Sequence, residues 1–285
     1  TNYSLSFIDN LSWIKGNHNM KFGGEARLSR LYTDRLGGTT YTFTNLENFL
    51  VNSPATAVIN GDVSAPSPFN NGVTGNRLGK TEAYSFYAQD EWRVSNELTF
   101  NIGLRYEFYT PMREARNRAV LYNIVTGGLD APGSRPFYHT SKLAFGPRLG
   151  LAYAPKMFRG KTVIRAGAGY YFGPGQGEDL IQPIESDRVS ITLNGAAARY
   201  PVDSLAAIKN FNINTATGIG VRAYAPGYSV PEKVLSYTFG IQQTLPGQAV
   251  ATVAYVGSQG RNLFLRSIAN VVTGVTPAGT AIRQF

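Results

Sequence analysis

Apolar and polar residues alternate with a period of two along stretches of about ten residues. Between residues 84 and 94, one set of alternate positions is mainly apolar: Tyr84, Phe86, Ala88, Trp92 and Val94. The intervening positions are mainly polar. Because successive side chains of a β-strand point to opposite faces, this period predicts strands with one apolar and one polar face. Helix-period patterns are almost absent, so we expect an all-β fold.

The strand patterns occur in pairs that are joined by short polar connections such as Ser95-Asn96-Glu97. A short polar connection between two alternating segments is typical of a β-hairpin. We therefore expect antiparallel hairpins over residues 3–31, 81–110, 142–173 and 233–258.

Long connections separate the hairpins, over residues 34–80, 111–141 and 173–232. Connections of this length are unusual in a compact soluble domain. Here they alternate strictly with the short turns, which is typical of outer-membrane β-barrels with short periplasmic turns and long extracellular loops. The sequence thus predicts one transmembrane β-barrel region built of meandering hairpins, residues 1–285, with three long extracellular loops.

Aromatic residues of the apolar set gather near the expected strand ends. Those beside the short turns are Trp13, Trp92, Phe100 and Tyr153, and those toward the long loops include Phe108, Phe172 and Tyr237. Two aromatic girdles are what the interfaces of a bilayer select. A charged side chain facing lipid at mid-depth would cost roughly 2–4 kcal/mol, so the polar face must meet water or protein.

Asp9 and Asp90 fall on the apolar set and are exceptions to this pattern. Either an interfacial depth or a β-bulge would accommodate them. Alternation also describes a soluble antiparallel sheet with one wet face, because periodicity alone does not say which face is outside.

Composition excludes several other kinds of protein. The 285 residues contain no Cys, which removes disulfides and thiolate metal sites, and no apolar run long enough for a transmembrane helix. The net charge is +9, but no run of Lys and Arg suggests nucleic-acid binding. His18 and His139 are expected as exposed loop residues, without the rigid Ser–His–acid arrangement of a hydrolase. We expect no enzymatic activity, no cofactor and no metal site, and the acids of the longest loop, such as Asp179, Glu185, Asp187 and Asp203, show no calcium-binding spacing.

Several segments resemble the barrel hairpins of TonB-dependent outer-membrane receptors, in particular their Oar-like branch. They are Asp9–Trp13 with Gly16–Gly24, Tyr87–Trp92 (YAQDEW), Leu98–Glu107 (containing NIGLRYE), Pro147–Tyr153 and Tyr255–Leu263. The resemblance covers most of the hairpins but not the long loops.

The resemblance implies a bacterial outer-membrane protein whose barrel of about 22 strands is filled by a plug domain. Such receptors capture a scarce ligand with loops and plug, and import it with energy from the TonB complex. This sequence shows eight strong strands and neither plug nor TonB box, so we expect an internal fragment of a larger barrel. The expected partners are the bilayer, plug, TonB and a small ligand such as a saccharide, peptide or chelate. No nucleic-acid partner is expected.

Charged residues of the polar set are the candidate site. Arg105, Arg148 and Arg165 could line the lumen and favour an anionic ligand. The alternative is that they pair with Glu91, Glu107 or carboxylates of a plug and are structural. Two other functions remain open: a self-contained eight-stranded barrel acting as a passive porin or anchor, and a soluble β-rich adhesin or binding domain.

Overall fold

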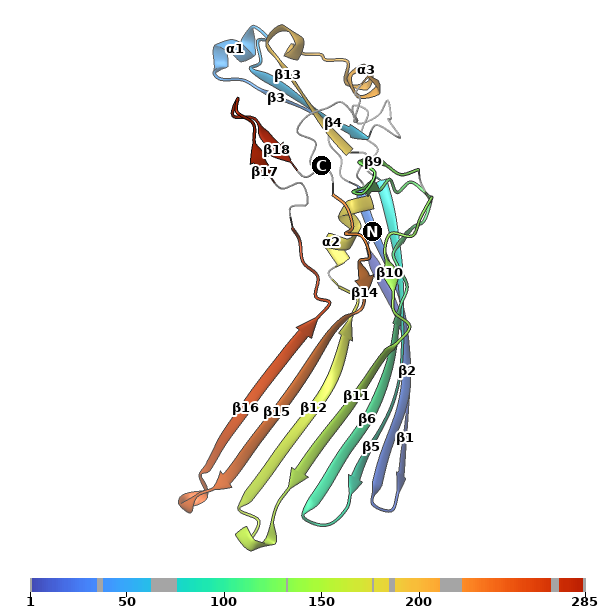
Figure 1. Ribbon diagram of the computed structural model, residues 1–285, viewed down its shortest axis with the longest axis vertical. Coiled ribbons are helices and arrows are strands. Elements are labelled where there is room, and N and C mark those ends of the chain that lie inside the picture. Colours follow the sequence, from blue (N-terminus) through green and yellow to red (C-terminus); the bar gives the residue numbers. More distant parts are fainter. Residues whose placement is uncertain are drawn as a thin grey trace.

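The computed structural model describes residues 2–34, 38–62, 76–131, 133–175, 177–184, 188–210, 222–267 and 272–283. Its main feature is a curved antiparallel sheet with short turns at one end and folded loops at the other (Figure 1). The long strands are β1 (Tyr3–Lys15), β2 (His18–Asp34), β5 (Asn76–Arg93), β6 (Leu98–Tyr109), β11 (Ala144–Tyr153), β12 (Thr162–Gly173), β15 (Glu232–Thr244) and β16 (Val250–Arg261). Each strand pairs with the next in chain order, so the sheet is a simple meander.

The two faces of the sheet follow the period of the sequence. Phe86, Leu104 and Leu149 lie on the face that we call outward, and they remain 59%, 48% and 61% exposed. The opposite face, called inward, carries charged side chains along the strands, including Glu25 and Arg105. An apolar face left this open in the folded chain must meet an apolar surrounding.

Some strands are longer than the alternation predicts. β2 and β5 stay in register up to Asp34 opposite Asn76, and β16 continues to Arg261. These extensions place polar residues such as Lys80 and Arg261 on the outward face, so the apolar period that marks a strand ends before the hydrogen-bonded ladder does.

The long loops have secondary structure of their own, which the sequence did not indicate. Strands β3 (Thr39–Thr42), β4 (Thr56–Asp62) and β13 (Arg188–Asn194) form a sheet in the order β13-β4-β3, so the first and third long loops pair with each other. Two short helices flank it, α1 (Leu46–Leu50), capped by Asn45, and α3 (Ser204–Lys209), capped by Asp203.

The remaining elements are short. Strand β10 (His139–Thr140) pairs in parallel with β14 (Ser229–Val230), β7 (Arg113–Glu114) pairs with β5, and β8 (Tyr122–Asn123) pairs with β9 (Gly128–Leu129). The others are β17 (Val272–Val275), β18 (Ala281–Arg283), α2 (Gly177–Ile181) and the 3₁₀ turns Lys156–Phe158, Gln182–Ile184, Gly195–Ala198 and Pro246–Gln248. Among the described residues, no helix is long and apolar enough to cross a membrane.

A cluster of buried apolar residues lies among the loops and not within the sheet. It contains Met112, Tyr138, Ile181, Ile184 and Tyr224 and draws on the second and third long loops. Packing of these loops therefore fixes the structure at the loop end.

The prediction that His18 lies in a loop is wrong, although its side chain is 42% exposed. His18 begins β2 on the outward face, where its Nδ1 lies 2.6 Å from Asp90 Oδ2 and its ring stacks on Trp92 at 5.4 Å. This partner explains how the apolar face accommodates Asp90. The register is continuous at Asp9 as well as at Asp90, so neither carboxylate sits in a bulge.

Candidate functional site

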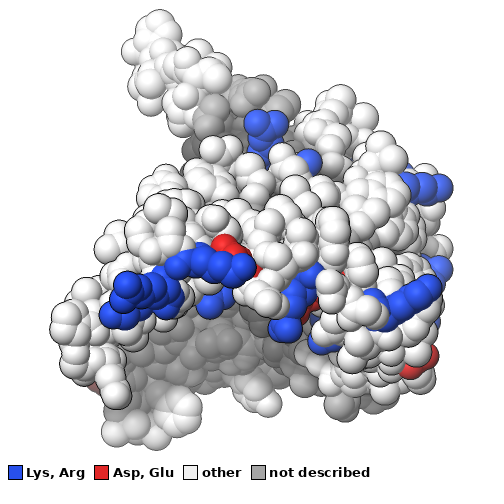
Figure 2. Space-filling model, turned by 90° about the horizontal axis from the view of Figure 1, so that it is seen from below, with Lys and Arg blue, Asp and Glu red and all other residues white. Residues whose placement is uncertain are grey.

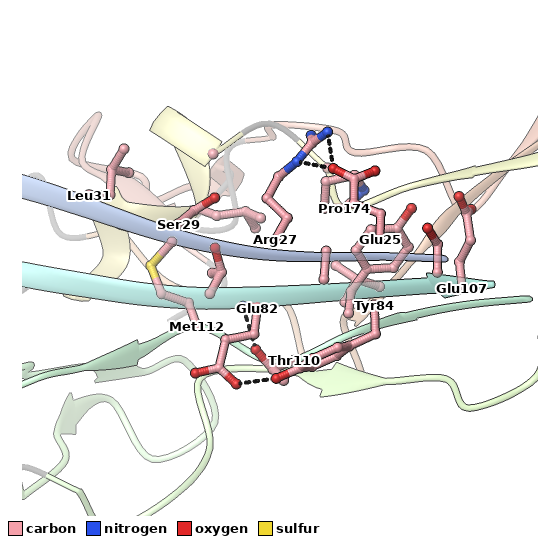
Figure 3. Close-up of a pocket in the computed structure, with 18 of the residues that line it drawn as sticks. Glu25, Arg27, Ser29, Leu31, Glu82, Tyr84, Glu107, Thr110, Met112 and Pro174 are labelled. Atoms are coloured by element: carbon pink, nitrogen blue, oxygen red, sulfur yellow. Dashed lines mark hydrogen bonds and ion pairs between the residues drawn. The ribbon is translucent and has the colours of Figure 1, made fainter. Parts of the chain in front are cut away.

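A cavity of about 350 Å³ lies at the loop end of the inward face, between strands β2, β5 and β6 and the loops that cover them (Figure 3). Its walls are formed by residues of the sheet on one side and by residues of the covering loops on the other. These residues include Glu25, Arg27, Ser85, Arg105, Glu107, Met112, Tyr138, Leu180 and Val230.

Strand β2 supplies the first charged pair. Glu25 and Arg27 lie two residues apart, so the period of the strand places both on the inward face. Arg27 donates from Nε and Nη2 to Glu25 Oε1, at 2.9 and 2.6 Å (Figure 3). Its Nε also donates to Ser6 Oγ at 3.2 Å. These contacts hold the guanidinium at the edge of the cavity.

Strand β6 supplies a second pair with the same spacing. Arg105 donates from Nε to Glu107 Oε1 at 2.5 Å and from Nη2 to Ser85 Oγ at 2.9 Å. Glu107 is only 7% exposed. Charged side chains this deep need a partner in place, so the pair is held firmly and presents little free charge to the cavity.

The cover of the cavity is apolar. Met112, Leu180 and Val230 are buried there together with Tyr138, whose hydroxyl accepts a hydrogen bond from the Met112 backbone N–H at 3.0 Å. Burial raises the pKa of Tyr138 to about 12. The neighbouring Tyr224 has its pKa raised for the same reason, so these phenols stay neutral donors and acceptors.

The other predicted lumen residues lie on the inward face but outside this cavity. Arg148 stacks over the ring of Tyr171 at 4.5 Å, and its buried Nε has no hydrogen-bond partner among the described residues. For Arg165 and Glu91, no ion pair occurs within the part of the chain that the structure describes. The structure thus brings together only Arg105 and Glu107 of the five candidates, and their contact with a ligand or plug stays a prediction.

Sequence reasoning did not select Glu25, Arg27 or Tyr138. The first two were visible as a charged pair at strand spacing, the same signal that Arg105 and Glu107 give. Tyr138 had no such signal, because its place depends on how the second and third loops pack.

The predicted interface aromatics lie on the outward face as expected from their position in each strand. Near the turns, Trp92 lies 6.4 Å from Phe100, and Trp13 and Tyr153 are 52% and 37% exposed. Toward the loops, the ring centres of Phe108 and Tyr84 lie 6.5 Å apart, and those of Tyr237 and Tyr255 lie 6.2 Å apart. The ring of Phe172 lies under the Lys233 ammonium group. Their contact with a lipid interface stays a prediction.

The turn end of the sheet is basic. Figure 2 views the molecule from this end and shows Lys and Arg side chains spread across it with few acids. The exposed cations of the turns and adjoining strand ends include Lys15, Arg93, Lys156, Arg159 and Lys161. Lys156 lies 3.0 Å from Glu97, and its hydrogen bonds hold the pKa of Glu97 below its usual range.

Among the described residues, no group of three or more His, Asp or Glu side chains could hold a metal ion. Asp179 instead pairs with Arg266 at 3.1 Å, and Asp203 caps α3. Glu185 and Asp187 lie outside the described residues.

Comparison with known families identifies the chain. A family model described as an outer membrane beta barrel domain matches residues 1–284, and the protein belongs to this family. No curated protein matches the sequence. Among solved structures, the chain is similar to the ferric-catecholate import receptor Fiu from E. coli K12, with 14% identity and a TM-score of 0.43. That alignment covers 99% of this chain and 33% of the receptor, so the chain spans about a third of that protein's length.

The fold is therefore that of an antiparallel outer-membrane β-barrel domain, and the protein is located in the bacterial outer membrane. Membership explains why the outward face is apolar and open, because in this family that face meets lipid. Membership in this family also excludes the soluble β-rich adhesin that the sequence alone had left open.

Proposed function

We propose that this chain forms part of the wall of a plugged, TonB-dependent import receptor, and that it carries out no enzymatic reaction. The long-loop end faces the outside of the cell, as in other outer-membrane barrels, and the short turns face the periplasm. The ligand is a small molecule such as a saccharide, peptide or chelate, captured at the loop end and passed along the inward face.

The observation that carries this proposal is the open sheet. Among the described residues, β1 and β16 each pair with a single neighbour and not with each other. An eight-stranded barrel closed on itself would pair its first and last strands. Lipid does not tolerate unpaired sheet edges, so further strands must complete the wall. This favours one arc of a larger barrel over a small passive barrel.

The cavity at the loop end supports capture of a small ligand. Its volume of about 350 Å³ lies in the range of small-molecule pockets. Charges of both signs on the wall and an apolar cover suit a ligand with polar groups on one side. The folded loops above it restrict access, which fits a gated receptor better than an open pore.

Conductance of the full-length protein in planar bilayers tests the proposal. A plugged receptor gives no steady conductance at rest and gains one when urea displaces its plug. The purified periplasmic domain of TonB should also bind it. A steady, ligand-independent conductance of the untreated protein would support the passive porin and contradict this proposal.

A further inference from the structure

Pairs of cations stand directly opposite each other on neighbouring strands at the loop end of the outward face. They are Arg30 with Lys80, Lys80 with Arg113, and Lys233 with Arg261. In the described registers, no other two Lys or Arg residues are directly opposed. Like charges directly opposite each other destabilise a sheet. Because such pairs occur only at the loop end of the outward face, we expect an anion at that end to compensate their charge.

The pair on β15 and β16 is the clearest case. Among the described residues, neither Lys233 nor Arg261 has a carboxylate within ion-pair distance. The nearest acid in sequence, Glu232, lies on the other face and accepts a hydrogen bond from the backbone N–H of Phe264 at 2.7 Å. The positive charge of this pair is therefore not neutralised by the described part of the chain.

The pair also sits at a defined depth. Lys233 is directly opposite Phe172, and its Nζ lies 4.0 Å from the ring centre of Tyr170 and 5.9 Å from that of Phe172. Tyr237 lies on the same face of β15, four residues further into the sheet. Aromatic residues mark the level where acyl chains meet headgroups. The two cations thus stand at the headgroup level of the leaflet at the loop end.

The second group repeats this arrangement on β2, β5 and β7. Lys80 lies between Arg30 and Arg113, four residues beyond the aromatic Tyr84. Arg113 Nη2 lies 2.9 Å from Glu82 Oε1. This single carboxylate balances only part of the positive charge of the three cations, so an excess of positive charge remains.

We propose that these outward cations bind phosphate groups of the lipid in the outer leaflet, which in a bacterial outer membrane is a phosphorylated glycolipid. The pair Lys233–Arg261 and the group Arg30–Lys80–Arg113 form two phosphate sites on the lipid-facing wall. This inference rests on the proposed orientation, with the long loops outside, and not on import of any ligand.

Lipid retention by the full-length protein tests the sites. The protein is expressed in a Gram-negative outer membrane and extracted in mild detergent, and its bound lipid A is counted by mass spectrometry. Each basic residue at an anionic lipid surface is worth about 1 kcal/mol, or roughly a fivefold change in affinity. A Lys233→Gln, Arg261→Gln double variant should therefore bind added diphosphoryl lipid A about thirtyfold more weakly and retain less during extraction.

The Lys15→Gln variant is the matched control. Lys15 is also an outward cation near an aromatic ring, 5.7 Å from Trp13, but it lies at the turn end. Its substitution should leave lipid A retention unchanged. If the control lost lipid A and the double variant did not, the orientation and this inference would both be wrong. Unchanged retention in the double variant would overturn the inference alone.

The lipid itself can be varied, which keeps the test valid if the double variant fails to fold. The wild-type protein should bind diphosphoryl lipid A more tightly than the monophosphoryl form, and the dephosphorylated form least. Excess inorganic phosphate should not displace the lipid. Equal affinity for all three forms, or full displacement by inorganic phosphate, would refute a lipid phosphate site. Loss of ligand import with normal lipid binding would count only against the proposed function.

Discussion

Replacement of an outward apolar residue by arginine changes the stability of the protein by an amount that depends on whether the outward face meets water or lipid. Leu104 lies near the middle of β6 and is 48% exposed, so its substitution removes little packing within the chain. In water, a Leu104→Arg change at such a position alters stability by no more than about 0.5 kcal/mol. At the midplane of a bilayer, arginine costs roughly 2–4 kcal/mol, a factor of about 30 to 1000 in the unfolding equilibrium.

The assay is reversible unfolding of the full-length protein in phospholipid vesicles, followed by tryptophan fluorescence and by heat-modifiable gel mobility. The control is Asn101→Arg, three residues away on the inward face, where the new side chain stands opposite Glu91 and gains an ion-pair partner. We expect this control to stay within about 0.5 kcal/mol of the wild type. A Leu104→Arg variant as stable as the control would refute the assignment of this face to lipid.

Three further substitutions test the site and the wall. Glu107→Gln leaves the half-buried Arg105 without its carboxylate and should cost about 1–3 kcal/mol in unfolding measurements. Tyr138→Phe leaves the buried Met112 N–H without its acceptor, and should speed hydrogen exchange and proteolysis of the loops with little effect on the sheet. Gly146→Ala should destabilise the sheet by about 1–3 kcal/mol, because a Cβ there would lie 2.7 Å from a backbone oxygen.

Two of these substitutions have a matched control. Glu91→Gln removes an inward carboxylate that has no ion pair among the described residues and should be neutral. Gly167→Ala meets its nearest atom at 3.4 Å and should be tolerated far better than Gly146→Ala. If a control variant lost as much unfolding free energy as the variant it is matched to, the contact removed in that variant would not explain its loss of stability.

The pH dependence of the loop cluster follows from Tyr138. Its pKa is raised from 10.0 to about 12 in the folded state, so the folded loops hold the phenol proton more tightly than the unfolded chain does. Their stabilisation should be complete below pH 10 and lost as the pH rises toward 12. Tyrosinate absorbance should rise together with loop proteolysis in this range. Ionisation of Tyr138 near pH 10 in intact loops would contradict this.

The sheet was predictable because its signal is local. Alternation in residues 84–94 is visible within one strand, and a short turn fixes its neighbour. The strand extensions over residues 32–34 and 76–80 were missed, since they continue the ladder with no apolar period to mark them.

The site was only partly predictable for the same reason. The pair Arg105–Glu107 is two residues apart, whereas His18 reaches Asp90 across 72 positions and Tyr138 meets Tyr224 through loop packing. Contacts of that kind depend on register and on how loops fold together, and neither is encoded in a short pattern.

Spin-label accessibility at two engineered cysteines tests the central claim most directly, because the 285 residues contain no native cysteine. Phe86→Cys places the label on the outward face and Val125→Cys places it in a loop, at positions that are 59% and 74% exposed in the folded chain. In the native membrane, we predict that the first label collides mainly with oxygen and the second mainly with a water-soluble nickel chelate. Equal collision of both labels with the nickel chelate would show that the outward face is in water and would contradict the account.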